Sequence, residues 1–284
     1  MSAKKSARRS LISPSGSLSC GRVSNSSRSP LVVALANQKG GVGKSTTAIN
    51  MAAALAFQGE RVLLVDLDPQ GNATSGLGID RGAIDISVYD VLLKESSLDD
   101  AIEPTSVRDL FVIPATIDLA GAEIELVSQF SRETRLKSAL AELEQDFDVI
   151  LVDCPPSLGL LTVNALVAAE EVVIPIQCEY YALEGVSQLL RNVELVRSNL
   201  NTDLKVGGVI LTMYDGRTRL SKDVSEQVRQ HFGDLCYRTV IPRSVRLSEA
   251  PSHGEPIEAF DPMSRGAIAY RHLGKEFRER HGLE

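Results

Sequence analysis

The sequence predicts an α/β protein with a doubly wound, mostly parallel sheet and helices on both of its faces. From residue 31 onward, short apolar runs alternate with longer amphipathic stretches. Several of these runs are apolar at every position, as expected for parallel strands that are buried on both faces. A glycine-rich segment also separates the first apolar run from the first amphipathic stretch. Together these observations indicate strand–helix units joined by right-handed crossovers.

Segments that are short, apolar and β-branched are expected to be strands. They are Leu31–Ala36, Arg61–Asp66, Leu110–Ile113, Val149–Asp153, Val172–Ile176 and Val206–Thr212. Helical patterns are found at about Lys44–Gln58, Ser131–Glu144, Leu158–Ala168, Leu183–Asn199, Ser221–Phe232 and Gly266–Arg280. In the last helix, Ile268, Leu273 and Phe277 are expected to form an inward-facing stripe. We find no internal repeat and no linker, so residues 31–284 are expected to form one domain.

Charge is distributed unevenly along the chain. The formal net charge is -7, yet residues 1–30 are basic and carry no acidic group. Their basic residues are Lys4, Lys5, Arg8, Arg9, Arg22 and Arg28. We expect a flexible tail here, because the segment has too few apolar residues to offset its ordering entropy; a weak tether to DNA or a partner is the alternative. The acidic remainder excludes DNA wrapping by overall charge, so any nucleic-acid contact requires a local basic face.

Cysteine spacing and hydropathy indicate a cytoplasmic protein. The cysteines Cys20, Cys154, Cys178 and Cys236 lie far apart, without a CxxC pair, so neither a zinc site nor a disulfide framework is expected. This usage fits a reducing compartment. No apolar h-region follows the basic start, and no run approaches the roughly 18 apolar residues that a membrane-spanning helix needs.

The glycine-rich segment, Lys39–Thr46, follows the first predicted strand and opens the first predicted helix. That position identifies a P-loop, because glycine backbone N–H groups and the helix N-terminus face phosphate oxygens. Lys44 is expected to neutralise the β- and γ-phosphates of ATP, and the Ser45 hydroxyl to bind Mg²⁺. The residues expected to hold the nucleotide are Gly40, Gly41, Val42, Gly43, Lys44, Ser45 and Thr46.

Carboxylates follow two of the predicted strands. Asp68 lies just beyond the strand that ends at Asp66, and it is the candidate for orienting and polarising the attacking water. Asp153 ends a second apolar strand and is expected to hold Mg²⁺ through a coordinated water. An aspartate at such a position can instead cap the next helix, which is the alternative for Asp153.

A second lysine, Lys39, precedes the glycines. An ordinary P-loop does not require it, and a solvated surface charge is the alternative. With Lys39 included, the segment resembles the deviant Walker A family, KGGxGK[ST], which contains ParA/Soj, MinD, the nitrogenase iron protein and arsenical-pump ATPases. The resemblance implies that Lys39 reaches across an ATP-dependent homodimer to the partner's nucleotide and acts there as a catalytic cation. It also implies that Asp66 lies close to the Mg²⁺ shell and that Asp68 acts on the water.

Four further stretches resemble ParA/Soj in particular, within a likeness that runs from about Leu31 to Gly274. They are Asn37–Gly41, Asp66–Thr74, Leu211–Asp215 and Ile241–Pro251. The resemblance implies that Met213 and Pro242, which follow late strands, lie at the adenine. A basic set accompanies them: Arg217, Arg219, Lys222, Arg243 and Arg246. Arg217 and Arg246 resemble the family's non-specific DNA-binding arginines, with arginines that only aid solubility as the alternative.

The resemblance implies a slow ATPase that converts ATP and water to ADP and phosphate. It would dimerise with ATP, bind double-stranded DNA non-specifically at the nucleoid, and hydrolyse ATP under a ParB-like activator. The residues do not distinguish a chromosome from a plasmid as its cargo.

Rival interpretations are a MinD-like membrane-associated ATPase and an ATPase that positions a protein cargo. A MinD-like protein needs a C-terminal amphipathic membrane helix. Residues 275–284 are mixed in charge and poor in apolar residues, so no membrane contact is expected. An iron-protein-like reductase needs paired cysteines at a cluster. Cys154 has no partner motif, and we expect it to be a small buried residue.

Overall fold

The computed structural model describes residues 29–179 and 184–283. The tail predicted at residues 1–30 lies outside the described residues, except for its last two.

A single eight-stranded sheet has the order β3-β4-β2-β5-β1-β6-β7-β8. Its strands are β1 (Leu31–Leu35), β2 (Val62–Asp66), β3 (Glu103–Pro104), β4 (Leu110–Ile113), β5 (Val149–Asp153), β6 (Glu171–Gln177), β7 (Lys205–Tyr214) and β8 (Cys236–Pro242). All neighbouring strands are parallel apart from the β3–β4 pair. The prediction of a mostly parallel sheet is therefore confirmed.

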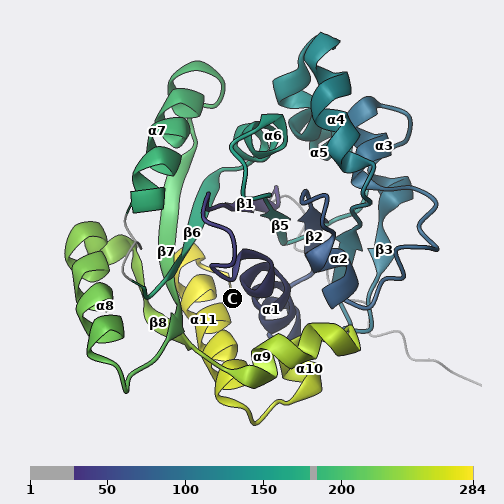
Figure 1. Cartoon of the computed structure of the whole chain (residues 1–284). Coiled ribbons are helices and arrows are strands. Elements are labelled where there is room, and N and C mark those ends of the chain that lie inside the picture. The colour runs from purple at the N-terminus through teal and green to yellow at the C-terminus, as the bar shows by residue number, and fades with distance from the viewer. Residues whose placement is uncertain (1–28, 180–183, 284) are drawn as a thin grey trace, which may run out of the picture.

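Helices cover both faces of this sheet (Figure 1). They are α1 (Lys44–Phe57), α2 (Asn72–Gly76), α3 (Val88–Leu93), α4 (Leu119–Glu125), α5 (Arg135–Ala141), α6 (Leu160–Ala168), α7 (Glu184–Asn199), α8 (Arg219–Phe232), α9 (Val245–Glu249), α10 (Ile257–Phe260) and α11 (Arg265–His281). Side chains of β1 alternate between two cores: Val33 and Leu35 pack with α1 and α11, whereas Val32 and Ala34 pack with α3 to α8. This alternation explains why the strand is apolar at every position.

Two strands, five short helices and one core position differ from the sequence-based expectation. The short helices α2, α3, α4, α9 and α10 were not predicted. The edge strands β3 and β8 were not among the predicted strands; β8 contains the polar residues Arg238 and Thr239, which break its apolar run. In α11, Leu273 and Phe277 are fully buried as predicted, but Ile268 is 38 % exposed. The prediction that Ile268 belongs to the inward stripe is wrong, because its position on the helix faces a groove beside β8.

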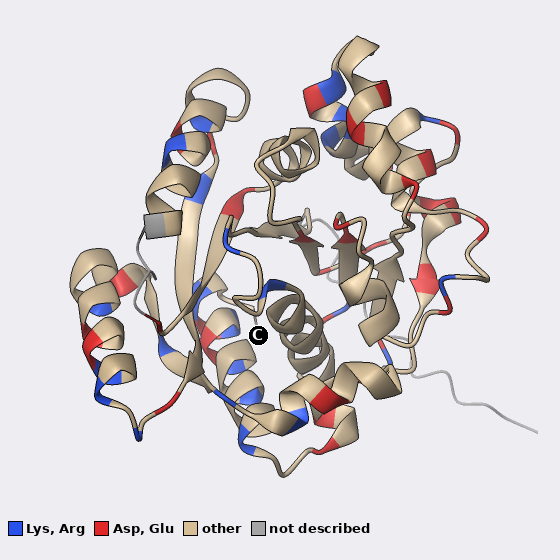
Figure 2. Ribbon diagram, in the orientation of Figure 1, with Lys and Arg blue, Asp and Glu red and all other residues tan. Residues whose placement is uncertain are grey.

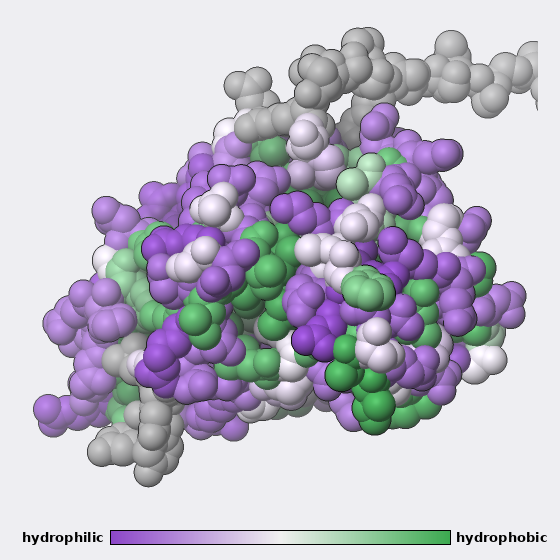
Figure 3. Space-filling model, turned by 90° about the horizontal axis from the view of Figure 1, so that it is seen from above, coloured by the Kyte–Doolittle hydropathy of each residue, from purple (hydrophilic) through white to green (hydrophobic). Residues whose placement is uncertain are grey.

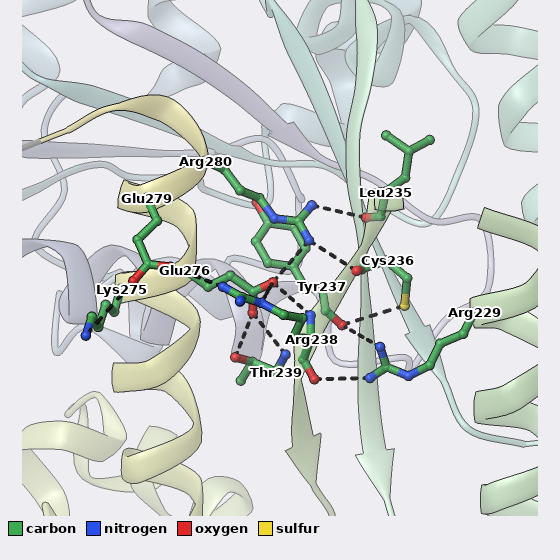
Figure 4. A network of polar contacts seen from close by, with 10 residues as sticks. All are labelled: Arg229, Leu235, Cys236, Tyr237, Arg238, Thr239, Lys275, Glu276, Glu279 and Arg280. Carbon is green, nitrogen blue, oxygen red and sulfur yellow. Dashed lines mark hydrogen bonds and ion pairs between the residues drawn. The ribbon is translucent and has the colours of Figure 1, made fainter. Parts of the chain in front are cut away.

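Polar contacts fix α11 to the edge strand β8 (Figure 4). The buried Glu276 carboxylate accepts hydrogen bonds from the backbone N–H groups of Arg238 and Thr239. It also accepts one from the Arg280 guanidinium, which donates in turn to the carbonyl oxygen of Cys236. Since α11 also packs against α1, the last helix joins the edge of the sheet to the helix that opens at the P-loop.

Figure 3 shows the molecule from above, turned by 90° from the view of Figure 1. On this face, hydrophilic residues are mixed with small groups of apolar residues. Phe130, which follows α4, is 94 % exposed.

Within the described part of the chain, no helix combines the length and the apolar character needed to cross a bilayer.

Candidate functional site

The P-loop lies at the carboxyl end of β1, in the middle of the sheet, and leads directly into α1 (Figure 1). Gly43 caps this helix with a positive φ of 84°, a conformation that glycine adopts without strain. Lys44, the first helical residue, is only 6 % exposed. The predicted order of strand, glycine loop and helix is thus present, and it presents backbone N–H groups at a helix N-terminus.

Buried polar side chains hold the loop in place from neighbouring elements. Asn37 donates from Nδ2 to the carbonyl oxygen of Pro175 in β6, at 2.7 Å. Thr212 in β7 donates from its hydroxyl to the carbonyl oxygen of Val42, also at 2.7 Å. Neither contact could be read from local sequence patterns, because the bonded residues lie 138 residues apart in the first contact and 170 in the second. The loop geometry is therefore set by β6 and β7 as well as by its own glycines.

Asp66 and Asp153 face each other across neighbouring strands, since they are register partners on β2 and β5. Asp66 is fully engaged: one oxygen accepts from the backbone N–H of Asp68, and the other accepts from the backbone and the hydroxyl of Thr74. Burial raises the pKa of Asp66 above its usual range, while the hydrogen bonds from Thr74 and Asp68 oppose the rise.

The Asp153 carboxylate, unlike that of Asp66, has no hydrogen-bond partner among the described residues. Its two carboxylate oxygens are buried, and neither accepts a hydrogen bond from any described residue. Burial raises the pKa of Asp153, and the charge of Asp66 raises it further, whereas the nearby Ser45 hydroxyl and the Lys44 charge lower it. A buried carboxylate without donors is costly unless a cation satisfies it. The donor set of Asp153 and Ser45 therefore fits Mg²⁺, a hard cation that prefers oxygen ligands.

A tight turn carries Asp68 toward the site. Asp68 is 6 % exposed, and its Oδ1 accepts from the backbone N–H of Gln70 at 3.0 Å. Arg81 closes the turn by donating to the carbonyl oxygens of Gln70 and Pro69. Among the described residues Asp68 Oδ2 has no hydrogen-bond donor, so this oxygen is available to a water molecule. Sequence reasoning missed Arg81, because nothing local marks it as a partner of the turn.

Lys39 stands at the edge of the loop. Its backbone N–H donates to Asn37 Oδ1 at 3.0 Å, and its side chain is 35 % exposed. The ammonium lies 3.9 Å from Glu179 Oε2, a long and partly exposed ion pair that holds it weakly. Lys39 is thus near the P-loop but directed to the outside, unlike the buried Lys44.

The two residues expected at the adenine lie at the ends of neighbouring strands. Met213 is inside β7, rather than after it, and has a positive φ of 51°. A Cβ placed on Gly43 would lie 3.9 Å from Met213 Cε, so this side chain borders the P-loop. Pro242 ends β8 opposite Tyr214 and lines the groove beside α11. Met213 therefore borders the P-loop, and Pro242 lies at the end of the neighbouring strand.

The four arginines expected to bind DNA fall into separate groups. Arg217 chelates Asp215 through Nε and Nη2, at 2.9 and 2.7 Å. These bonds lower the pKa of Asp215 to about 2, and the charge of Arg243 contributes to that shift. Arg217 and Arg243 thus lie near the same carboxylate. Arg217 is in the turn after β7, and Arg243 is in the turn after β8.

Arg246 and Arg219 also have acidic neighbours. Arg246 in α9 pairs with Glu249 and Asp261, and Arg219 pairs with Asp223 at 3.6 Å. The net positive charge around these four arginines is therefore smaller than their number suggests, because acidic residues lie beside them. Basic residues nevertheless recur on α8 and α11, whereas acidic residues are prominent around α3, α4 and β3 (Figure 2).

The predicted character of Cys154 is confirmed. It is fully buried next to Asp153, and burial raises the pKa of its thiol far above the usual range. A buried thiol of this kind is an unreactive packing residue.

Comparisons with known proteins identify a family and similar chains. A family model described as "AAA domain" matches residues 31–206. The sporulation initiation inhibitor protein Soj of Bacillus subtilis is 61% identical over 245 residues, 86% of this chain and 97% of that protein. The chromosome partitioning protein ParA of Myxococcus xanthus is 53% identical, covering 88% of each chain.

A solved structure has a similar fold and was determined with a nucleotide analog. It is described as cobyrinic acid a,c-diamide synthase from Mycobacterium smegmatis, with bound ATP analog and magnesium. It is 44% identical, with a TM-score of 0.78, over 90% of this chain and 97% of that one.

A parallel sheet, a P-loop at its centre and carboxylates at the ends of β5, the strand next to β1, and of β2, the strand beyond β5, define a P-loop ATPase. The matches to Soj and ParA narrow that class. The chain belongs to the ParA/Soj family of chromosome-partitioning ATPases.

Proposed function

We propose that the protein is an ATP-gated dimerising switch, with residues 31–284 as its ATPase domain. It binds double-stranded DNA without sequence preference at the nucleoid in the cytoplasm. A ParB-like activator accelerates its slow hydrolysis of ATP, and hydrolysis releases the DNA. Partitioning then follows from repeated cycles of binding and release.

The position of Lys39 carries this proposal. Lys44 is buried and already supplies a cation to the phosphates of its own P-loop. Lys39 extends outward from the same loop, and only a long ion pair to Glu179 restrains it. A second subunit placed against this edge would receive Lys39 at its own nucleotide, so that ATP joins the two subunits. Loss of the γ-phosphate would then remove what both Lys39 side chains hold.

The chemistry assigned to the site follows from its carboxylates. Asp68 orients the attacking water through the oxygen that lacks a donor, and Lys44 balances charge that develops on the phosphates. Mg²⁺, when bound by Ser45 and Asp153, neutralises phosphate charge. The buried Asp66 holds the turn before Asp68 through the Asp68 backbone N–H, so we place it behind the reacting groups.

DNA binding is assigned to Arg217, Arg219, Arg243 and Arg246. Phosphate oxygens would replace the carboxylates that now pair with three of these side chains. Such an exchange gains little free energy per residue, because exposed ion pairs are weak on both sides. Pairing two subunits would double the number of contacts and make binding depend on ATP.

DNA retention tests this function. The protein is passed over immobilised duplexes of two unrelated sequences, with ATP, ADP or no nucleotide, at about 50 and about 200 mM salt. We expect retention only with ATP, equal for both sequences and much weaker at the higher salt concentration. Binding that does not depend on nucleotide, or the absence of binding while ATP still binds, would contradict the proposal.

A further inference from the structure

Thr74 connects two strands of the site through one buried hydroxyl group. It lies in α2 and is completely buried. Its hydroxyl donates to Asp66 Oδ2 at 2.7 Å, and its backbone N–H donates to the same oxygen at 2.8 Å. The hydroxyl oxygen also accepts from the backbone N–H of Ala115, at 2.9 Å. Thr74 thereby joins the end of β2 to the segment that follows β4.

The direction of these hydrogen bonds is fixed by chemistry. A backbone N–H can only donate, so the Thr74 hydroxyl must accept from Ala115. Its single proton is then directed to Asp66, which can accept it only with a carboxylate oxygen. A hydrogen bond to an ionised acceptor is stronger than one between neutral groups. The chain Ala115–Thr74–Asp66 therefore stabilises the ionised form of Asp66 in one orientation.

Orientation matters because both carboxylates of the site are buried at adjoining strand ends. Asp66 and Asp153 are register partners, and Asp153 has no donor among the described residues. Thr74 turns one oxygen of Asp66 toward α2, while the other receives the backbone N–H of Asp68. Asp153 is thereby left as the carboxylate whose oxygens have no hydrogen-bond donor in the described part of the chain, and the backbone of Asp68 is held at a fixed place.

We propose that Thr74 is a positioning residue for ATP hydrolysis, which holds Asp66 and, through it, the backbone of Asp68. This proposal rests on the proposed role of Asp68 in orienting water. Thr74 is completely buried and its hydroxyl bonds only to Asp66 and to the Ala115 backbone among the described residues, so we assign it no contact with ATP or the reacting atoms. Its loss should therefore lower the rate of the chemical step and leave nucleotide binding largely intact.

The test compares Thr74→Val, which removes the hydroxyl but keeps the shape, with Thr74→Ser, which keeps the hydroxyl. Thr105→Val is the matched control, because the Thr105 hydroxyl also bonds to backbone groups, those of Val107 and Leu110, at the β3–β4 turn away from the site. Single-turnover ATP hydrolysis is measured without DNA or activator. Binding of a fluorescent ATP analogue is measured in parallel over a series of Mg²⁺ concentrations.

We expect Thr74→Val to lower the single-turnover rate about tenfold, the effect of losing one hydrogen bond to a charged group. Analogue affinity at saturating Mg²⁺ should stay within about twofold, and Thr74→Ser should recover most of the rate. Thr105→Val should lower the melting temperature without changing the rate of the folded protein. If Thr74→Val does not fold, Thr74→Ala is measured against the same criteria.

Equal rates for Thr74→Val, Thr74→Ser and the unmodified protein would overturn the proposal. So would a rate lost only in proportion to the unfolded fraction, since that result assigns Thr74 a purely structural role. The assay contains no DNA, so its outcome is separate from the DNA-retention test of the proposed function.

Discussion

Gly254 and Gly78 lie backbone against backbone, so that a Cβ on Gly254 would stand 2.7 Å from the Cα of Gly78. Gly78 ends the segment that begins at Asp68 and includes α2, while Gly254 follows α9, which carries Arg246. Two segments with different proposed roles, one for water and one for DNA, are therefore in direct main-chain contact. No side chain lies between them to absorb a shift, and close-packed interiors transmit such shifts.

Replacing Gly254 by alanine should destabilise the protein by about 2–4 kcal/mol, from overpacking and from strain at positive φ. Its φ is +67°, and the added methyl group would collide with Gly78. Gly282→Ala is the control, because Gly282 has the same left-handed conformation, with a φ of +60°, but no atom within 4 Å of an added Cβ. Urea denaturation of both variants measures the difference. Equal losses of unfolding free energy would show that the contact with Gly78 is not tight.

Replacing Asp68 by alanine should slow hydrolysis and leave a long-lived ATP-bound state. The Asp68 oxygen without a donor is lost, whereas the P-loop that binds ATP is unchanged. Single-turnover hydrolysis and release of labelled nucleotide measure the two effects. Asp203→Ala, at an exposed position between α7 and β7, is the control. Normal turnover in Asp68→Ala would remove this residue from the mechanism.

Replacing Arg246 by glutamate should abolish ATP-dependent DNA retention while ATP binding persists. The new carboxylate would join Glu249 and Asp261, which now pair with Arg246, and would repel phosphate. The control is Arg108→Glu, because the Arg108 side chain is 95% exposed and lies on the turn before β4. The salt dependence of any residual binding should be shallower than in the unmodified protein. Unchanged retention in Arg246→Glu would exclude this residue from the DNA surface.

Protonation of Glu276 in acid should lower the free energy of unfolding of the protein. Burial alone raises the pKa of Glu276, but hydrogen bonds from Arg238, Thr239 and Arg280 outweigh burial and lower it below the usual 4.5. The folded protein therefore binds this proton less readily than the unfolded chain. The resulting stabilisation is present above about pH 4.5 and is lost as the pH falls through the lower, folded value.

Thermal unfolding of the unmodified protein and of Glu276→Gln, from pH 7 to pH 3, tests this relationship. The melting temperature of the variant should be lower at pH 7, and the gap should narrow as the solution becomes more acidic. The control is Glu142→Gln, because Glu142 is exposed. A difference in melting temperature that stays constant with pH would mean that the charge of Glu276 does not contribute to stability.

Local patterns predicted the centre of the molecule well. β1 is apolar throughout, and β2 and β5 are apolar up to their terminal aspartates, because helices cover both faces of the sheet. The P-loop is a continuous motif. By contrast, the edge strand β8 has an apolar run that is interrupted by two consecutive polar residues, Arg238 and Thr239. The helices α2 and α9 have five residues each, too few to show a helical period.

The buried polar contacts of the site escaped prediction for a different reason. Thr74 and Thr212 act on partners that folding brings to them, and the Ala115 N–H that binds Thr74 comes from 41 residues further along the chain. Hydroxyl residues near strand ends are common, so their sequence positions alone do not reveal a role. Carboxylates at the ends of apolar strands are a rarer pattern than hydroxyl residues there, and Asp66 and Asp153 were therefore predicted from the sequence.

The packing of α11 on α1 has a consequence for synthesis of the protein on the ribosome. The hydroxyl groups of Thr47 in α1 and Tyr270 in α11 lie 3.2 Å apart, although 223 residues separate them in the chain. β1 and the P-loop leave the ribosome well before the helix that covers α1, because 223 residues separate the two contact points. The nascent chain must therefore keep an apolar face of α1 exposed while those residues are synthesised, a period in which chaperones would be expected to bind it.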